Sequence, residues 1–193
     1  AQSLSTDYAG DGGGIFNNHG ALVMNLVEIA GNETANGIYG TYNGGDGGHG
    51  AGLYSLGGTV TLTDSQVTGN STGNGGDGGT GFNSYGGDGG SGGGIFLGDG
   101  AVITATRTVI GLNLTGAGGF GNRYPIGYGG AGGAGAGIYM AEGTLTLVDS
   151  VVQQNTTGAG GSGCGDLSSP MGCTAGTGGG IAVFGIEQNA RLD

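Results

Sequence analysis

The chain has 193 residues, of which 56 are glycine, three are Lys or Arg and 14 are Asp or Glu, giving a formal net charge of −11. This balance argues against a nucleic-acid partner, which needs clustered cations. With two prolines and no strict Gly-X-Y period the chain is not collagen, and no apolar run approaches the roughly 20 residues of a membrane span.

The first 13 residues resemble the end of a glycine-rich segment that recurs later. Tyr8 to Asp11 match Tyr85 to Asp88, and glycines follow in both places. The chain opens with Ala-Gln-Ser and no Met, which fits export after removal of a signal peptide. We therefore expect an extracellular or cell-surface location.

Five units follow, each opened by a glycine and an aliphatic residue, and in the first four an aromatic residue comes next. They start at Gly14, Gly52, Gly94, Gly137 and Gly180. The first four have a second glycine six residues on, an alternating run of Val, Thr and Leu, and a closing Asn. Period-two alternation predicts half-buried strands. The sequence thus predicts one repeat domain over residues 1–193, with a tail over 1–13, repeats over 14–51, 52–93, 94–136 and 137–179, and a partial repeat over 180–193.

Alignment of the units gives apolar columns that we expect to point inward. The columns are Ile15, Leu53, Ile95, Ile138 and Ile181; Leu22, Val60, Ile103 and Leu145; Met24, Leu62, Ala105 and Leu147; and Ile29, Val67, Ile110 and Val152. A column of mostly small polar residues, Val27, Ser65, Thr108 and Ser150, lies between them. The third unit needs one extra residue near Ala101, which predicts a bulge. Such columns require coils stacked about 4.8 Å apart.

The second half of each repeat is glycine-rich and has few aliphatic residues. These stretches cover residues 35–50, 73–92, 116–135 and 158–179. One interpretation is disorder, because glycine loses the most entropy on ordering. The interpretation we favour is ordered excursions, extended like polyproline II, that stack closely because nothing projects from the backbone. Tyr42, Tyr85 and Tyr128 recur at nearly one phase, which predicts a stacked ladder.

The phrases from Gly93 to Phe96 and from Gly143 to Thr157 resemble the repeat of right-handed parallel β-helix surface proteins. That group includes exported proteins with a pectin-lyase-like fold and adhesins similar to polymorphic outer-membrane proteins. The resemblance covers a little under half the chain and implies an all-β fold, a right-handed parallel β-helix solenoid, here with Gly-rich stacked excursions. It does not specify a function, because this fold hosts lyases, adhesins and filament proteins alike.

An Asn-X-Thr pattern closes each of the first four repeats. Its asparagines are Asn32, Asn70, Asn113 and Asn155. One interpretation is N-glycosylation along one edge of the stack. The other is an Asn ladder at a corner of the coils, with the amides hydrogen-bonded along the stack.

Two further groups are candidate sites. Asp46, Asp77 and Asp88 lie in Gly-Gly-Asp-Gly-Gly segments and are candidate calcium ligands, although one carboxylate per segment is few for an ion that takes six to eight oxygens. Their alternative role is that of solvated turn residues. Cys164 and Cys173 are expected to form a local disulfide in an exported protein.

Catalysis finds little support, and we expect a protein that is not an enzyme and has no cofactor unless calcium binds. Asp64, Arg107 and Asp149 share one column with Leu26, which predicts a structural ion ladder. Alternating threonines such as Thr59, Thr61 and Thr63 raise ice binding, but outward Thr is ordinary in strands.

The repeat pattern starts late in one unit and stops early in another, which predicts unpaired strand edges at both ends. Head-to-tail stacking would bring Ile181 and Val183 against Ile15 and Leu22 of the next subunit. We therefore expect a structural subunit of an extracellular filament or surface layer whose partner is itself. The alternative is a monomeric adhesin or glycan-binding module; a polysaccharide lyase or an ice-binding protein is less favoured.

Overall fold

The computed structural model describes all residues except 1–8, 81–83, 122–126, 164–172, 185–188 and 193, and its ordered elements are all strands. The strands are β1 (Ile15–Asn18), β2 (Ala21–Asn25), β3 (Glu28–Ala30), β4 (Leu53–Leu56), β5 (Thr59–Thr63), β6 (Gln66–Thr68), β7 (Ile95–Gly98), β8 (Ala101–Thr106), β9 (Val109–Gly111), β10 (Ile138–Met140), β11 (Gly143–Val148), β12 (Val151–Gln153), β13 (Ile181–Val183) and β14 (Asn189–Leu192).

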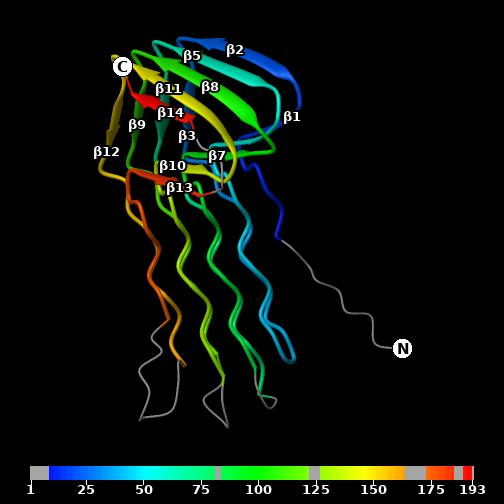
Figure 1. The fold of residues 1–193 in the computed structure, drawn as a ribbon. Helices are drawn as coiled ribbons and strands as arrows, with labels where there is room; N and C mark the ends of the chain where they lie inside the picture. The colour runs from blue at the N-terminus through cyan, green and yellow to red at the C-terminus, as the bar shows by residue number, and fades with distance from the viewer. Residues whose placement is uncertain (1–8, 81–83, 122–126, 164–172, 185–188, 193) are drawn as a thin grey trace.

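The strands form three parallel sheets that the chain visits in turn. Sheet A has the order β1-β4-β7-β10-β13, sheet B β14-β11-β8-β5-β2 and sheet C β12-β9-β6-β3. Strands β1–β3, β4–β6, β7–β9 and β10–β12 are therefore four coils, which we number 1 to 4, and β13 and β14 begin coil 5. This architecture of stacked parallel strands confirms the expected all-β repeat and is consistent with a parallel β-solenoid (Figure 1).

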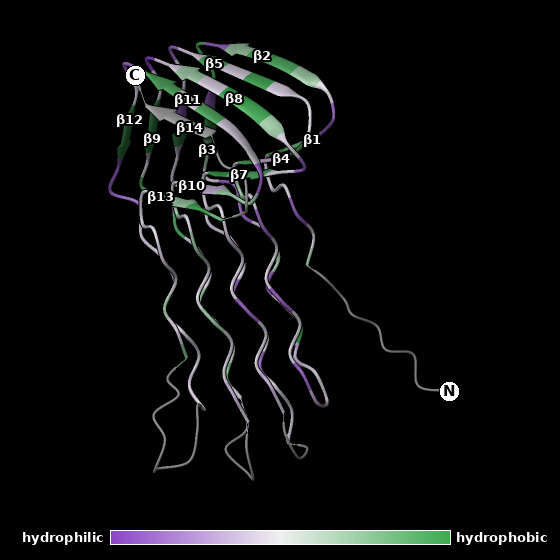
Figure 2. Ribbon diagram, in the orientation of Figure 1, coloured by the Kyte–Doolittle hydropathy of each residue, from purple (hydrophilic) through white to green (hydrophobic). Residues whose placement is uncertain are grey.

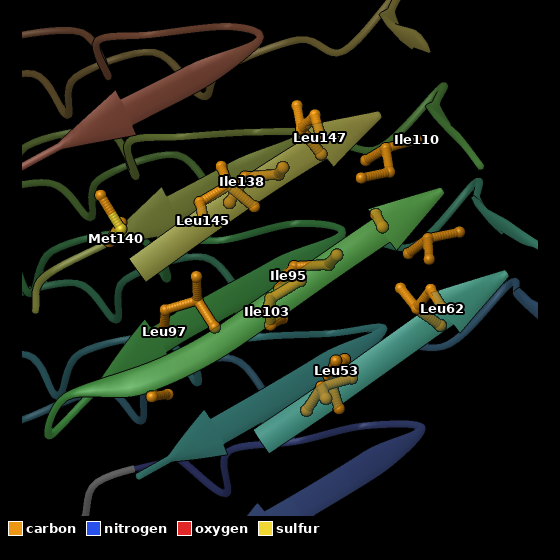
Figure 3. Close-up of a cluster of buried hydrophobic side chains, with 14 of the residues drawn as sticks. Leu53, Leu62, Ile95, Leu97, Ile103, Ile110, Ile138, Met140, Leu145 and Leu147 are labelled. Carbon is orange, nitrogen blue, oxygen red and sulfur yellow. The ribbon is translucent and has the colours of Figure 1, made fainter. Parts of the chain in front are cut away.

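The strand register confirms the apolar columns. Ile15 pairs with Leu53, and the same column continues through Ile95, Ile138 and Ile181. Leu62 is fully buried and Leu147 is 5% exposed, as the inward assignment requires. Side chains from all three sheets fill one core between them (Figure 3), and the apolar residues concentrate in the strands (Figure 2).

The corners between sheets explain two irregularities in the sequence. Leu26, Asp64, Arg107 and Asp149 all have positive φ, between 47° and 56°, at the turn from sheet B to sheet C. The predicted column therefore exists, at a tight corner rather than on the face of a strand. Coil 3 also contains the expected extra residue before Val102, because Leu56 pairs with Gly98 while Thr59 pairs with Val102.

The glycine-rich segments extend from the coils as paired arms (Figure 1). Along the chain, each segment follows a strand of sheet C and precedes the next strand of sheet A. We call residues 35–42, 73–80, 116–121 and 158–163 outgoing arms 1 to 4, and residues 43–50, 85–92, 128–135 and 173–178 returning arms 1 to 4. Their described residues are ordered and hydrogen-bonded, which confirms the stacked excursions and overturns the disordered alternative for them.

The arms form two hydrogen-bonded layers with a three-residue period. Gly75 N donates to Ala117 O and Gly78 N to Phe120 O, which joins outgoing arm 2 to outgoing arm 3. Gly76 N donates to Gly45 O, which joins the outgoing layer to the returning layer. Since two of every three residues face a neighbouring arm, only the third position has room for a side chain. This is the close packing that glycine permits.

Two expectations about the arms are wrong in register. Tyr85 stacks on Tyr128 with ring centroids 5.7 Å apart, but Asn43, not Tyr42, occupies the equivalent place, because Tyr85 N donates to Asn43 Oδ1. Asp11 is equivalent to His49 and Ser91 rather than to Asp88, since His49 N donates to Asp11 Oδ1. Both errors come from sequences with a three-residue period, which align almost equally well when shifted.

Candidate functional site: ladders and the ends of the stack

The described residues contain no group of three or more His, Cys, Asp or Glu side chains that could hold a metal ion. Arg107 is held by Asp64 through Nε···Oδ1 and Nη2···Oδ2 distances of 2.6 and 2.7 Å. This hydrogen bond and the charge of Asp64 raise the pKa of Arg107, while the hydrogen bond from Arg107 lowers the pKa of Asp64. The guanidinium therefore stays protonated. It forms an ion pair with Asp64, whereas Asp149, the third charged residue of the predicted ladder, contributes only the attraction of its charge.

The four asparagines form a ladder along the stack. Asn70 donates both its backbone N–H and its Nδ2 to Asn113 Oδ1, at 3.0 and 2.9 Å, and Asn32 makes the same pair of bonds to Asn70. Asn113 does so to Asn155. The second Nδ2 proton of Asn70 is donated to Ile29 O at 3.0 Å. The ladder interpretation of this pattern is therefore confirmed.

The threonines of the first three Asn-X-Thr patterns fasten the arms to the coils. Thr72 Oγ1 donates to Gly90 O in returning arm 2, at 2.6 Å, and accepts from Gly116 N of outgoing arm 3, at 2.9 Å. Thr34 and Thr115 make equivalent bonds. Because Asn70 and Asn113 are 0% and 1% exposed, a glycan on either would have to break the ladder. The structure thus accounts for the recurring pattern without a sugar.

The candidate calcium ligands serve as backbone acceptors at the outward position of the arms. Asp46 Oδ1 accepts from Asp88 N at 2.8 Å and Asp88 Oδ1 from Ala131 N at 2.7 Å, along the returning layer. Asp77 Oδ1 accepts from Phe120 N in the outgoing layer. These bonds satisfy N–H groups that have no backbone partner in the neighbouring arm. The three carboxylates are divided between two layers, so they do not converge on one ion.

The predicted disulfide involves Cys164, which lies outside the described residues. Cys173 begins returning arm 4 within the described part. The pairing stays a prediction, which mass spectrometry with and without a reductant would check.

A ladder of aromatic rings crosses sheet A. Phe16, Tyr54, Phe96, Tyr139 and Phe184 stack in that order, with centroid distances of 5.5, 4.6, 5.0 and 5.2 Å. The first four of these residues define the repeat in the sequence, but no contact between them was predicted. The signal was present, since an aromatic residue follows the aliphatic one in the first four units. The contact of Phe184 with Tyr139 could not be predicted, because the residue that pairs with Tyr139 in the next strand is Ala182.

Burial raises the pKa of Tyr54 to about 12, and the negative charge of Asp11 and a hydrogen bond to it add to the effect. Burial also raises the pKa of Tyr139. Both phenols therefore stay neutral at physiological pH and act as packing groups with a polar edge. The ring faces inside the ladder are covered by neighbouring rings, so they are not platforms for a sugar.

The four residues assigned to self-assembly lie at the two ends of the stack. Ile15 is in β1 and Leu22 in β2, the strands at one edge of sheets A and B, while Ile181 and Val183 are in β13 at the other edge of sheet A. All four pack against the core but are only partly buried. Their equivalents inside the stack, such as Leu53 and Ile95, are fully buried.

The Thr positions on sheet B do not form a complete array. Thr61, Thr104 and Thr146 are in register, but Val23 occupies the same place in β2. Val102 likewise stands between Thr59 and Thr144 in the neighbouring row.

A search of family models, curated proteins and solved structures found no match to this chain. In the described part of the chain, no helix is long and apolar enough to span a bilayer.

Proposed function

We propose that this protein is a structural subunit of an extracellular filament or surface layer, built as a right-handed parallel β-helix and assembled head to tail. The proposal includes that the chain is not an enzyme and that its partner is a second copy of itself. The stabilising interactions inside the chain are ladders that repeat once per coil along one direction. A second copy added in the same direction would extend those of sheets A and B, whose strands β13 and β14 lie at that end of the stack.

The observation that carries the proposal is the aromatic ladder. It ends at both ends in rings that are half exposed, Phe16 at 53% and Phe184 at 45%, whereas Tyr54 inside the ladder is 8% exposed. Phe184 of one copy and Phe16 of the next would stack as Tyr139 stacks on Phe184, at about 5 Å. The partly buried apolar residues at the same ends, Ile15 and Ile181, would become core residues.

Electron microscopy and sedimentation of the purified protein test the proposal. We expect fibres from the intact chain and a higher critical concentration for Phe16→Ala and Phe184→Ala. Phe120→Ala is the matched control, since this ring is 57% exposed but lies on outgoing arm 3, away from both ends. Deletion of Gly180–Asp193 should abolish assembly while the four coils remain folded.

The second candidate is a monomeric adhesin or glycan-binding module that uses the returning layer. Its support is the outward pair of Asp46 and Asp88, with Asp11 at the next outward position, which places carboxylates on one layer of the arms. An intact protein that stays monomeric at high concentration, or a truncated one that still forms normal fibres, would contradict the end-to-end model and favour this alternative.

A further inference from the structure

The inner positions of the outgoing arms obey a strict steric rule. A Cβ added at Gly73, Gly76 or Gly79 of outgoing arm 2 would fall on the carbonyl oxygen of its counterpart in arm 1. Gly116 and Gly119 meet arm 2 in the same way, and Gly158 and Gly161 meet arm 3. An outgoing arm that stacks on an earlier one must therefore have glycine at each of these positions.

Outgoing arm 1 breaks this rule on one side only. Ala35, Ile38 and Thr41 stand where arm 2 has its three glycines, and all three are exposed, Ile38 at 50%. The positions that face returning arm 1, Gly37 and Gly40, remain glycine. Side chains at these three positions exclude any further arm against this side, whether from the same chain or from another copy.

Returning arm 4 breaks the corresponding rule at the opposite end. Ala175 takes the place of Gly47, Gly89 and Gly132, where an added Cβ would fall on a carbonyl oxygen of the next outgoing arm. Ala175 is exposed. Gly10, in contrast, is equivalent to Gly48 and Gly90, where an added Cβ would fall on a carbonyl oxygen of the preceding returning segment. Gly10 is also glycine, although nothing lies within 4 Å of a Cβ added there.

We propose that these side chains form the key of the head-to-tail joint between two copies, an inference that rests on the proposed assembly. With β13 of one copy beside β1 of the next, returning arm 4 lies against Gly10 of the next copy, where glycine permits close contact. In the slot between outgoing arm 4 of the first copy and outgoing arm 1 of the second, the side chains of outgoing arm 1 exclude an arm. Ala175 from one side and Ala35, Ile38 and Thr41 from the other project into this same slot.

The key selects one joint among those that the parallel strands would allow. Direct stacking of outgoing arm 1 on outgoing arm 4 would set Ile38 against backbone, where even a Cβ does not fit. The joint through β13 and β1 leaves a gap as wide as one arm, which the side chains of the key occupy. The surface is thus specific for a second copy in a single register.

Cysteine pairing tests the register. Ala35→Cys and Ala175→Cys proteins are mixed and gently oxidised, and linked peptides are identified by mass spectrometry. We expect a 35–175 link between copies, because both Cβ vectors aim at the same vacant oxygen position and a disulfide needs Cα atoms about 4.4–6.8 Å apart. Asp77→Cys mixed with Ala175→Cys is the control that should not link, since Asp77 is at an outward position.

The outcomes separate this inference from the proposed function. If fibres form without the 35–175 link, the proposed key is wrong but the proposed filament function stands. If no fibres form, both are overturned. Identification of the linked peptides distinguishes the expected link from any that involves Cys164 or Cys173.

A second variant measures the contribution of the key without a thiol. Ile38→Gly should raise the critical concentration for assembly about tenfold or more, since an apolar side chain would no longer be buried at the joint. The thermal unfolding of the isolated subunit should stay unchanged, because Ile38 is exposed there. Tyr39→Gly is the control, since this side chain is 65% exposed at the neighbouring outward position. Equal effects of the two variants would overturn the proposal.

Discussion

The coils and the arms follow one repeat, but they are stabilised in different ways. The coils bury Leu, Ile and Val from three sheets, and residues such as Leu62 and Ile103 are fully buried. The arms bury almost no apolar side chains and are held by backbone hydrogen bonds between layers, such as Gly87 N to Gly76 O at 2.9 Å. In the coils a side chain must be present at the inward position, and in the arms it must be absent.

The difference shows that the coils provide the template for the arms. Isolated glycine-rich chains lose much backbone entropy on ordering and bury little apolar surface in return. Here each arm begins and ends at a coil, and Thr72 holds both returning arm 2 and outgoing arm 3 at the point where they leave it. We infer that the arms order only because the coils fix their spacing.

The largest effect is expected in the core of the coils. Leu62→Asp removes a fully buried side chain and places a carboxylate without a partner among apolar residues. Loss of a buried Leu alone costs about 2–5 kcal/mol, and the buried charge adds to this cost. We expect circular dichroism to show an unfolded or aggregated chain. Thr61→Asp, a substitution of a half-buried residue on the outer face of the same strand, should remain folded.

A smaller effect, confined to the arms, is expected from Gly76→Ala. The new Cβ would fall on the carbonyl oxygen of Ile38, so outgoing arms 1 and 2 must separate. Hydrogen exchange should then accelerate at arm residues such as Gly79, while amides of β5 and β8 remain protected. Tyr39→Ala, at an exposed outward position of outgoing arm 1, is the control. Equal loss of protection in the coils would show that the two regions form one cooperative unit.

The Asn ladder of the coils is tested by Asn70→Ala. This change leaves the N–H and Nδ2 of the half-buried Asn32 without their acceptor, and the cost for a fully buried group would be about 1–3 kcal/mol. Chemical denaturation should show a clear loss of stability that the exposed Asn36→Ala does not match. An intact mass equal to that of the bare sequence would confirm that the asparagines are unmodified.

The smallest effect concerns the aromatic ladder at alkaline pH. Because the pKa of Tyr54 is raised to about 12 in the folded chain, its neutral form stabilises the fold fully below pH 10. That contribution is lost as the pH rises from about 10 through 12. Absorbance titration should show a late-ionising phenol that disappears in Tyr54→Phe. Ionisation of every tyrosine near pH 10 in the folded protein would contradict the buried ladder.

Much of the coil architecture was predictable, and the arms were predictable only in part. The columns through Ile15 and Leu22 were visible because strand periodicity and a repeat of about 40 residues reinforce each other. The Tyr42 and Asp11 registers were wrong because glycine-rich sequences with a three-residue period give no unique alignment. The Thr72 bonds and the aromatic stack were not identified, since both join residues from successive repeats whose contact depends on the stacking.

The sequence by itself determined which residues face the core, because burial selects apolar side chains and does so at the same phase in every coil. It also determined that the excursions contain little besides backbone. Only the tertiary structure decided which side of each arm must be glycine, since that depends on the carbonyl groups of neighbouring arms. For the same reason it alone distinguished Ile38 and Ala175 from the glycines at equivalent positions, and so located the two ends of the arm layers.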